Sequence, residues 1–140
     1  MFILDTDHIS LFQRNHPHVS TNVLATPPLE LATTVVTVEE QLRGRLERVR
    51  RARNDEEVVR AYQNLLATVL YFRTIQIIGF DTPSQEILRR LRAQQVRIGT
   101  QDLRIAAIVL RQGATLVTRN RRDFGAIPSL HTADWSLPES

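Results

Sequence analysis

Phe2-Ile3-Leu4-Asp5-Thr6-Asp7 places an uninterrupted apolar run directly before two carboxylates. An apolar run without alternating polar residues is typical of a strand buried on both faces, as in a parallel sheet. Side chains that follow a parallel strand lie in the crevice at the carboxyl end of the sheet. This stretch therefore predicts a buried first strand with Asp5 at the mouth of such a crevice.

Outside this stretch, the chain alternates between short apolar runs and segments with helical periodicity. Further strands are predicted at 31–38, 75–80 and 114–118, with an edge strand within 127–135. Helices are predicted at 9–12, 19–26, 39–53, 56–72 and 101–112, and from Thr82 onward. This order predicts an α/β fold of three layers, in which helices flank a central parallel sheet. Residues 1–140 are expected to form a single domain, with an antiparallel helical hairpin between Glu39 and Arg73.

Local signals set several expected helix boundaries. Thr6 or Asp7 is expected to cap the first helix, and Asn54 with Glu57 fits a capping box. Thr82-Pro83 fits a cap followed by proline at the first helical position. Gly113 is the expected C-terminal stop of the helix that begins at 101.

Acidic residues also stand at the ends of later apolar runs. Glu40 follows the predicted strand 31–38, Asp102 opens the apolar helix 101–112, and Asp123 comes shortly after strand 114–118. If these side chains meet Asp5 in one crevice, they repel one another unless they share protons or hold a cation. Oxygen ligands suit Mg²⁺ or Mn²⁺. The pattern therefore predicts a divalent-metal site, and so an enzyme.

Each acid also has a local explanation. Asp5 could be a helix N-cap, and Thr37-x-x-Glu40 fits a capping box in which Glu40 bonds back to the Thr37 amide. Asp102 in the first turn of a helix is favoured by the helix dipole. Asp123 could pair with neighbouring arginines. The metal-site interpretation depends on the acids acting together.

The composition limits the classes of protein to consider. The chain has 140 residues and a formal net charge of +3, and all 18 basic residues are arginine. The absence of cysteine excludes disulfides and thiolate chemistry. The positive charge points modestly to nucleic acid. No apolar stretch reaches the ~20 residues of a membrane span, and the N-terminus does not fit a signal peptide, so a cytoplasmic protein without membrane contact is expected.

Read together, the motifs resemble the PIN-domain family, and most closely the VapC-type toxins of bacterial toxin–antitoxin pairs. The resemblance runs from residue 2 to about 135. It is carried by Leu4-Asp5-Thr6-Asp7, Thr37-x-x-Glu40-x-x-x-Gly44, Ile98-Gly99-x-x-Asp102-x-x-Ile105-Ala106, and Gly113-Ala114-x-Leu116-Val117-Thr118-x-Asn120-x-x-Asp123-Phe124.

The resemblance implies a metal-dependent endoribonuclease that uses Mg²⁺ (or Mn²⁺), is usually a homodimer, and is held inactive by a small antitoxin. The catalytic residues would be Asp5, Glu40, Asp102 and Asp123, with Asp5, Asp102 and Asp123 as metal ligands. Asn120 stands where many relatives have aspartate, so Asp123 and Asn120 are alternatives for the fourth group. Thr6 and Thr118 would be the small hydroxyl residues near the metal.

Three arginines, Arg119, Arg121 and Arg122, lie beside the fourth acid. Their guanidinium groups suit the backbone phosphates of an RNA substrate. The alternative is a solvated charged loop without a binding role.

Two other functions are compatible with parts of the pattern. Asp5-Thr6-Asp7 after an apolar strand also resembles the start of haloacid-dehalogenase-type phosphatases, in which Asp5 would be a phosphorylated nucleophile. The absence of lysine and of an adjacent aspartate pair weighs against that reading. The second alternative is a non-catalytic PIN fold that binds RNA or protein, and the asparagine at position 120 is the one feature that supports it.

Overall fold

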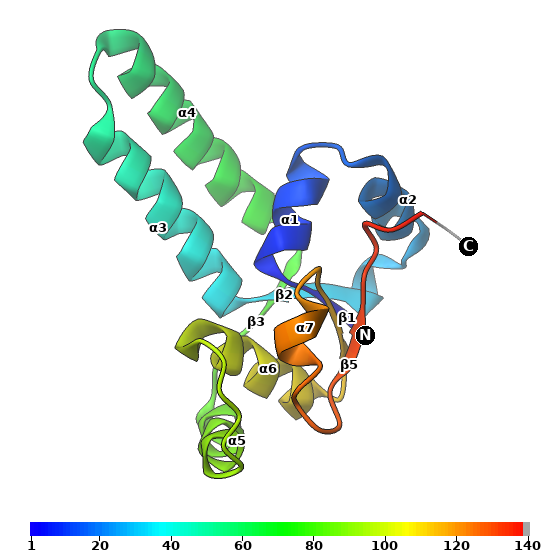
Figure 1. Cartoon of the computed structure of the whole chain (residues 1–140). Coiled ribbons are helices and arrows are strands. Elements are labelled where there is room, and N and C mark those ends of the chain that lie inside the picture. The colour runs from blue at the N-terminus through cyan, green and yellow to red at the C-terminus, as the bar shows by residue number, and fades with distance from the viewer. Residues whose placement is uncertain (139–140) are drawn as a thin grey trace.

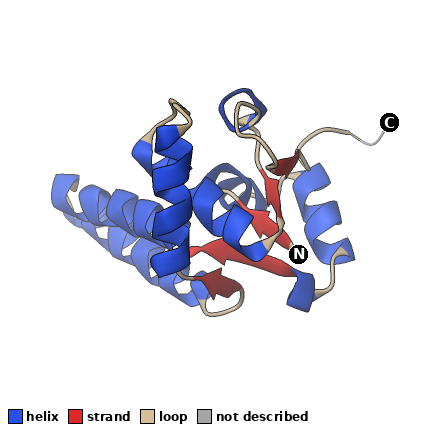
Figure 2. Cartoon of the chain, turned by 90° about the horizontal axis from the view of Figure 1, so that it is seen from below, coloured by secondary structure: helices blue, strands red, loops and turns tan. Residues whose placement is uncertain are grey.

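The computed structural model describes residues 1–138 and contains a five-stranded parallel sheet with strand order β3-β2-β1-β4-β5 (Figures 1 and 2). The predicted α/β fold with a parallel sheet is confirmed. The strands are β1 (Phe2–Leu4), β2 (Leu31–Thr34), β3 (Gln76–Ile78), β4 (Thr115–Val117) and β5 (His131–Ala133). β1 lies between β2 and β4, with Leu4 in register with Thr33 and Val117, so the first strand is central.

Helices pack on both faces of the sheet, because side chains alternate along each strand. Leu4 and Val117 face a core shared with α1 (Thr6–Gln13), α2 (Pro17–Ala25) and the end of α4 (Asp55–Phe72). Ile3 and Leu116 face the larger core, formed with α5 (Thr82–Ala93), α6 (Thr100–Gln112) and α7 (Arg121–Phe124). The predicted three layers are therefore present, and Figure 2 shows the strands enclosed by helices.

α3 (Val35–Arg51) and α4 form the predicted helical hairpin, which projects away from the sheet (Figure 1). Val69 and Leu70, near the end of α4, are exposed, whereas Phe72 is buried against β1 and β4 residues. Phe72 is buried because the last turn of α4 returns to the sheet.

The strand predicted at 31–38 ends at Thr34, and α3 begins at Val35 rather than at Glu39. The Thr34 side chain caps the helix by accepting a hydrogen bond of 3.1 Å from the Thr37 amide. The β-branched residues 35–38 favour a strand locally, but the N-cap and burial of Val36 and Thr37 in the helix outweigh that preference. The predicted capping box from Thr37 to Glu40 is therefore wrong, because both residues lie inside the helix.

α1 and α2 begin earlier than predicted, and the caps of α1 and α5 lie earlier in the chain than predicted. Asp5, and not Thr6 or Asp7, is the N-cap of α1, and His16 caps α2 with Pro17 at the first position. Asp81, rather than Thr82, caps α5 and accepts hydrogen bonds from the amide and hydroxyl of Ser84 at 2.9 and 2.7 Å.

The remaining boundaries follow the sequence closely. The Asn54 side chain accepts a hydrogen bond from the Glu57 amide at 2.9 Å, as the predicted capping box requires, although the Glu57 carboxylate bonds the amide of Arg53. Gly113 ends α6 with a φ of 61°, a left-handed conformation that glycine tolerates. Residues 119–125, where the sequence indicates a loop or short turn, contain the short helix α7, and a 3₁₀ helix η1 (Pro28–Glu30) precedes β2. No helix within residues 1–138 is long and apolar enough to cross a membrane.

Candidate metal and nuclease site

Asp5 lies at the carboxyl end of β1 and is 6% exposed. Its backbone amide donates to the Val117 carbonyl, which continues the β1–β4 ladder to the residue after the strand. Its Oδ1 accepts a hydrogen bond from the Thr6 amide at 2.8 Å, and its Oδ2 accepts one from the Thr118 hydroxyl at 2.7 Å. The predicted supporting residues Thr6 and Thr118 thus both contact Asp5.

The environment of Asp5 favours its protonated form. Burial, followed by the neighbouring Asp7 carboxylate, raises the pKa of Asp5 from 3.8 to about 6, although the hydrogen bonds from Thr118 and Thr6 act in the opposite direction. The more distant Asp102 carboxylate adds to the rise. An ionised Asp5 would therefore be stabilised by a cation placed between these groups.

Glu40 points from the second turn of α3 toward the same region. Its Oε1 is buried and has no hydrogen-bond partner among residues 1–138. Burial is the main cause of the raised pKa of the Glu40 carboxyl, and the Asp102 carboxylate is the next. A buried carboxylate oxygen without a protein partner is costly, and this oxygen can still accept a hydrogen bond or contact a cation.

Glu39, the neighbour of Glu40, is exposed. Its carboxylate accepts hydrogen bonds from Gln101 at 2.9 Å and from Arg43 at 2.6 Å. The two adjacent glutamates therefore have opposite surroundings, and only Glu40 belongs to the candidate site.

Asp102 lies in the first turn of α6, at the end that faces the β1 and β4 strand ends. Burial raises the pKa of Asp102, and the Asp123 and Asp7 carboxylates raise it further. The helix dipole stabilises an acid at this position, but it does not remove the repulsion from the two neighbouring acids. The Asp102 carboxylate is therefore repelled by Asp7, near the start of the chain, and by Asp123, near its end.

Asp123 and Asn120 act together on α7. The Asn120 side chain caps the helix, accepting from the Asp123 amide at 3.4 Å, and its Nδ2 donates to Asp123 Oδ2 at 3.1 Å. The Asn120 amide donates to the Thr118 hydroxyl at 3.0 Å. The alternative in which Asp123 pairs with neighbouring arginines is not observed in the described part of the chain. Arg119, Arg121 and Arg122 are exposed around this turn.

Asp7 belongs to the same group of acids, although the sequence suggested for it only a capping or supporting role. Its Oδ2 accepts from the Arg119 amide at 3.0 Å, and its Oδ1 bonds His8 Nδ1 at 2.8 Å. His8 is fully buried, and its Nε2 bonds the Trp135 amide at 3.1 Å, so this histidine holds the C-terminal segment. The spacing Asp5-x-Asp7 at the start of a helix was the signal for the role of Asp7, because both residues then lie at the strand end.

The predicted acids therefore gather at one end of the sheet, on β1, α3, α6 and α7. They are not packed tightly: within residues 1–138, no three acidic or histidine side chains are close enough to hold a metal ion in their present positions. The chemistry of the donors fits Mg²⁺ or Mn²⁺, because all are oxygens. The Asp102 carboxylate raises the pKa of Asp5, the Asp123 carboxylate raises the pKa of Asp102, and Glu40 Oε1 has no hydrogen-bond partner within residues 1–138.

Comparison with known proteins supports the fold through structure rather than sequence. No family model matches the chain, and no curated protein matches it. Among solved structures, DNA-bound VapBC from Salmonella typhimurium matches with a TM-score of 0.79 and 22% identity, covering 96% of this chain and 97% of that chain.

Two further structures give the same result. VapBC-1 from nontypeable Haemophilus influenzae matches with a TM-score of 0.78 and 24% identity over 97% of this chain and 98% of that one. FitAcB from Neisseria gonorrhoeae matches with a TM-score of 0.74 and 22% identity over 96% and 98%. The chain has the PIN-domain fold of VapC-type toxin structures, which confirms the resemblance inferred from its motifs.

Proposed function

We propose that residues 1–140 form one PIN-type domain that hydrolyses RNA phosphodiester bonds with the help of Mg²⁺ or Mn²⁺, as the toxin of a toxin–antitoxin pair. One observation carries the proposal: carboxylates from β1, α3, α6 and α7 face one another without cationic partners, and a buried Glu40 oxygen has no hydrogen-bond partner among the described residues. Such an arrangement lowers stability and is useful when a cation and a phosphate occupy the site.

Asp5, Asp102 and Asp123 would hold the metal, which when bound neutralises charge on the phosphate and on the leaving oxygen. Asn120 orients Asp123 through the contact between their side chains and fixes the turn through Thr118. We therefore favour Asp123 as the fourth acid and Asn120 as a residue that positions it.

Glu40 would act as the general base. Its unpartnered oxygen can accept a proton from the attacking water, and its raised pKa makes it a better proton acceptor than an exposed glutamate. In-line attack of that water would leave 5′-phosphate and 3′-hydroxyl ends. Thr118 and Thr6 hold Asp5 in place through hydrogen bonds to its two oxygens.

Cleavage assays with purified protein and labelled RNA test this function directly. We expect cleavage with Mg²⁺ or Mn²⁺, and its loss in EDTA and in Asp5→Asn. Cleavage that continues undiminished under either condition contradicts the proposal. Binding of RNA without cleavage, and without binding of divalent ions in calorimetry, would instead favour the non-catalytic PIN fold.

The phosphatase alternative has less structural support. The chain has no lysine and no adjacent aspartate pair, and the solved structures described above that match its fold are VapBC and FitAcB structures, not phosphatases. A phospho-aspartate trapped at Asp5 would restore that alternative.

The proposed partners follow from the same relatives. The matched structures include a toxin–antitoxin complex from Klebsiella pneumoniae, so a small antitoxin is the proposed protein partner of this chain. A homodimer is also proposed, for which the exposed α4 residues Val69 and Leu70 provide apolar surface. The cytoplasm is the proposed location, where RNA and a co-expressed antitoxin are present.

A further inference from the structure

A cavity of about 270 Å³ lies next to Glu40 and is lined by residues of α3 and of α1 with its C-cap. Glu40 and Thr6 line it on the side of the site, and Arg14, Arg45 and Arg48 line it farther away. We propose that these three arginines bind the backbone phosphates of single-stranded RNA next to the cleaved bond, and so lead the strand into the site. This inference rests on the proposed nuclease function and adds the path of the substrate.

The path follows one face of α3. Glu40, Gly44 and Arg48 are spaced four residues apart, so they lie along the same side of the helix. A methyl group added at Gly44 would meet no atom within 4 Å, so the space between Glu40 and Arg48 is open. The distance along the axis from Glu40 to Arg48 is about 12 Å at the usual rise per residue, which is enough for several phosphates of a stacked strand.

The arginines that line this cavity differ from most other arginines of the hairpin. Arg14, Arg45 and Arg48 form no ion pair within the described residues, although Arg45 Nε donates to the Thr68 hydroxyl at 3.0 Å. Elsewhere on the hairpin, arginines pair with glutamates one helical turn away, as Arg60 does with Glu56. Guanidinium groups without a carboxylate partner remain available for phosphate oxygens, which they bind in a forked geometry.

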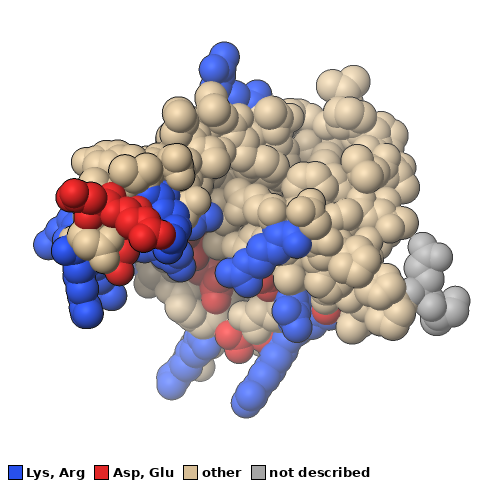
Figure 3. Space-filling model, turned by 90° about the horizontal axis from the view of Figure 1, so that it is seen from above, with Lys and Arg blue, Asp and Glu red and all other residues tan. Residues whose placement is uncertain are grey.

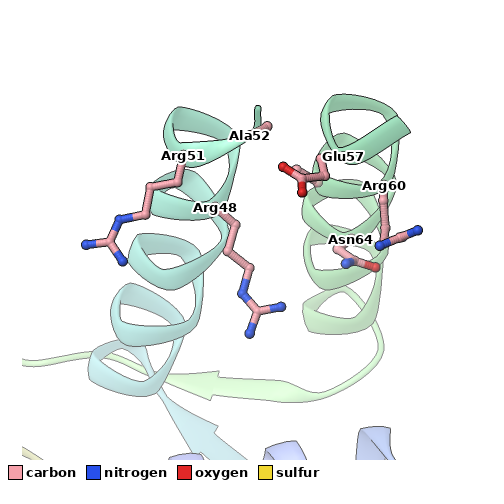
Figure 4. Close-up of a pocket in the computed structure, with 7 residues that line it drawn as sticks. Arg48, Arg51, Ala52, Glu57, Arg60 and Asn64 are labelled. Atoms are coloured by element: carbon pink, nitrogen blue, oxygen red, sulfur yellow. The ribbon is translucent and has the colours of Figure 1, made fainter. Parts of the chain in front are cut away.

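Arg48 marks the far end of the path. It also lines a second cavity of about 270 Å³ between α3 and α4, and Figure 4 shows its side chain directed into the space between the two helices, whereas Arg51 points away from that space. The Glu57 carboxylate also lines this second cavity and accepts a hydrogen bond from the Arg53 amide at 2.8 Å. Because this carboxylate would repel a phosphate, the path ends near Arg48.

The charge distribution on the surface agrees with this path. Figure 3 shows acidic atoms in the recessed middle of one face, with arginines on either side. A polyanion is attracted by the arginines, and only the segment beside Glu40 meets the acids, where the proposed divalent ion would neutralise it. Contacts to phosphates carry no sequence information, so the three arginines should raise affinity equally for RNAs of different sequence.

The test compares two double variants with the same change in charge. Arg14→Gln/Arg48→Gln removes two arginines of the path, and Arg50→Gln/Arg90→Gln removes two exposed arginines elsewhere. Both are made in a Glu40→Gln background, so that RNA is bound without being cut. Fluorescence anisotropy with labelled single strands of several sequences, at several salt concentrations, gives Kd and its salt dependence. Thermal unfolding checks that each variant is folded.

We expect the path variant to bind each RNA about tenfold more weakly. The slope of log Kd plotted against the logarithm of the salt concentration should fall by about 1.4, which is ~0.7 for each lost phosphate contact. The control variant should keep the slope of the parent. Arg14→Lys/Arg48→Lys should also keep most of the slope, because the charge is retained. Unchanged binding in the path variant, or an equal loss in the control, overturns the proposal.

Cleavage assays with proteins that keep the native Glu40 separate this proposal from the nuclease function. If the wild-type protein binds RNA through the arginines but never cleaves it, the nuclease function fails and the path stands. If Arg14→Gln/Arg48→Gln cleaves with an unchanged KM, the path fails and the nuclease function stands.

Discussion

The strand-end site and the α3–α4 hairpin both carry many charges, but these charges have opposite surroundings in the two regions. On the hairpin, Arg60 and Glu56 pair across one helical turn while both remain exposed. At the site, Asp5, Glu40 and Asp102 come from distant parts of the chain, are partly or fully removed from water, and have the same sign. Local pairs of exposed charges change stability little, whereas like charges held together by the fold are costly. This cost is the reason why we propose the strand-end site as the functional region.

The largest effect should come from removing the proposed base. Glu40→Gln is expected to lower kcat for RNA cleavage by roughly 10²–10⁴-fold, because an amide cannot accept the proton of the attacking water. Glu39→Gln is the matched control, since the adjacent side chain is exposed and bonds Gln101 and Arg43. Cleavage rates of the two variants, measured side by side, check this prediction. An equal loss of cleavage in both variants would contradict the assignment of Glu40, and not Glu39, to the site.

Stability of the metal-free protein should depend on pH through the site. The pKa of Asp5 is 3.8 in the unfolded chain and about 6 in the folded one, so the folded state binds more protons between these values. The free energy of unfolding should therefore fall as pH rises from about 4 to about 6, by about 3 kcal/mol from Asp5. The raised pKa values of Glu40 and Asp102 act in the same direction. Urea unfolding at a series of pH values measures this slope.

Two controls sharpen the pH prediction. Asp5→Asn should remove most of the slope, because the amide does not titrate. Mg²⁺ added at neutral pH should raise the unfolding midpoint of the wild-type protein and have less effect on Asp5→Asn, since a cation stabilises the ionised form. Stability that rises with pH over this range would show that the acids are already compensated in the folded protein.

The N-cap of α3 should have an intermediate effect. Thr34→Ala is expected to lower the free energy of unfolding by about 1 kcal/mol, because the Thr37 amide loses its hydrogen-bond acceptor. It should also lower cleavage, because the cap sets the start of the helix that holds Glu40. Thr34→Ser, which keeps the hydroxyl, is the matched control. Urea unfolding and cleavage rates are the two measurements, and a stable but inactive Thr34→Ser would contradict the capping role.

The smallest effect is expected on the hairpin. Arg60→Gln breaks an exposed pair of 3.0 Å with Glu56. Pairs of this kind contribute about 0.3–0.5 kcal/mol, so the unfolding midpoint should hardly change. Thermal unfolding at low and high salt checks this, since screening should remove the small difference. A change as large as that of Thr34→Ala would mean that the hairpin charges contribute more than local pairing.

The sequence predicted where the acids would meet, but not how each is held. Asp5 was predicted from its place after the apolar run Phe2–Leu4, and the β1–β4 pairing confirms that it lies beside Thr118. The role of Asn120 could not be predicted, because its contact with Asp123 depends on the short helix α7, where the sequence indicated only a loop or short turn. A helix of one turn has too few residues to show a periodic pattern.

The start of α3 shows why local propensity was insufficient. Val35-Val36-Thr37-Val38 favours a strand by residue type, and a strand would have moved Glu40 to a helix terminus. In the structure, the Thr34 cap and the contact of 3.1 Å between the hydroxyls of Thr6 and Thr37 place this segment in the first helical turn. The contact joins residues 31 positions apart, so no local window of sequence contains it.

Apolar periodicity and the position of each acid after an apolar run were enough to determine the parallel α/β fold, the hairpin and the end of the sheet where the acids gather. Those features follow from burial, and the apolar or polar character of successive residues indicates which of them are buried. Only the tertiary structure decided that Glu40 Oε1 has no hydrogen-bond partner among residues 1–138, that Asp7 belongs with the acids, and that Arg14 lines the same cavity as Arg48. These depend on distances between elements that are far apart in sequence, and such distances are set by packing.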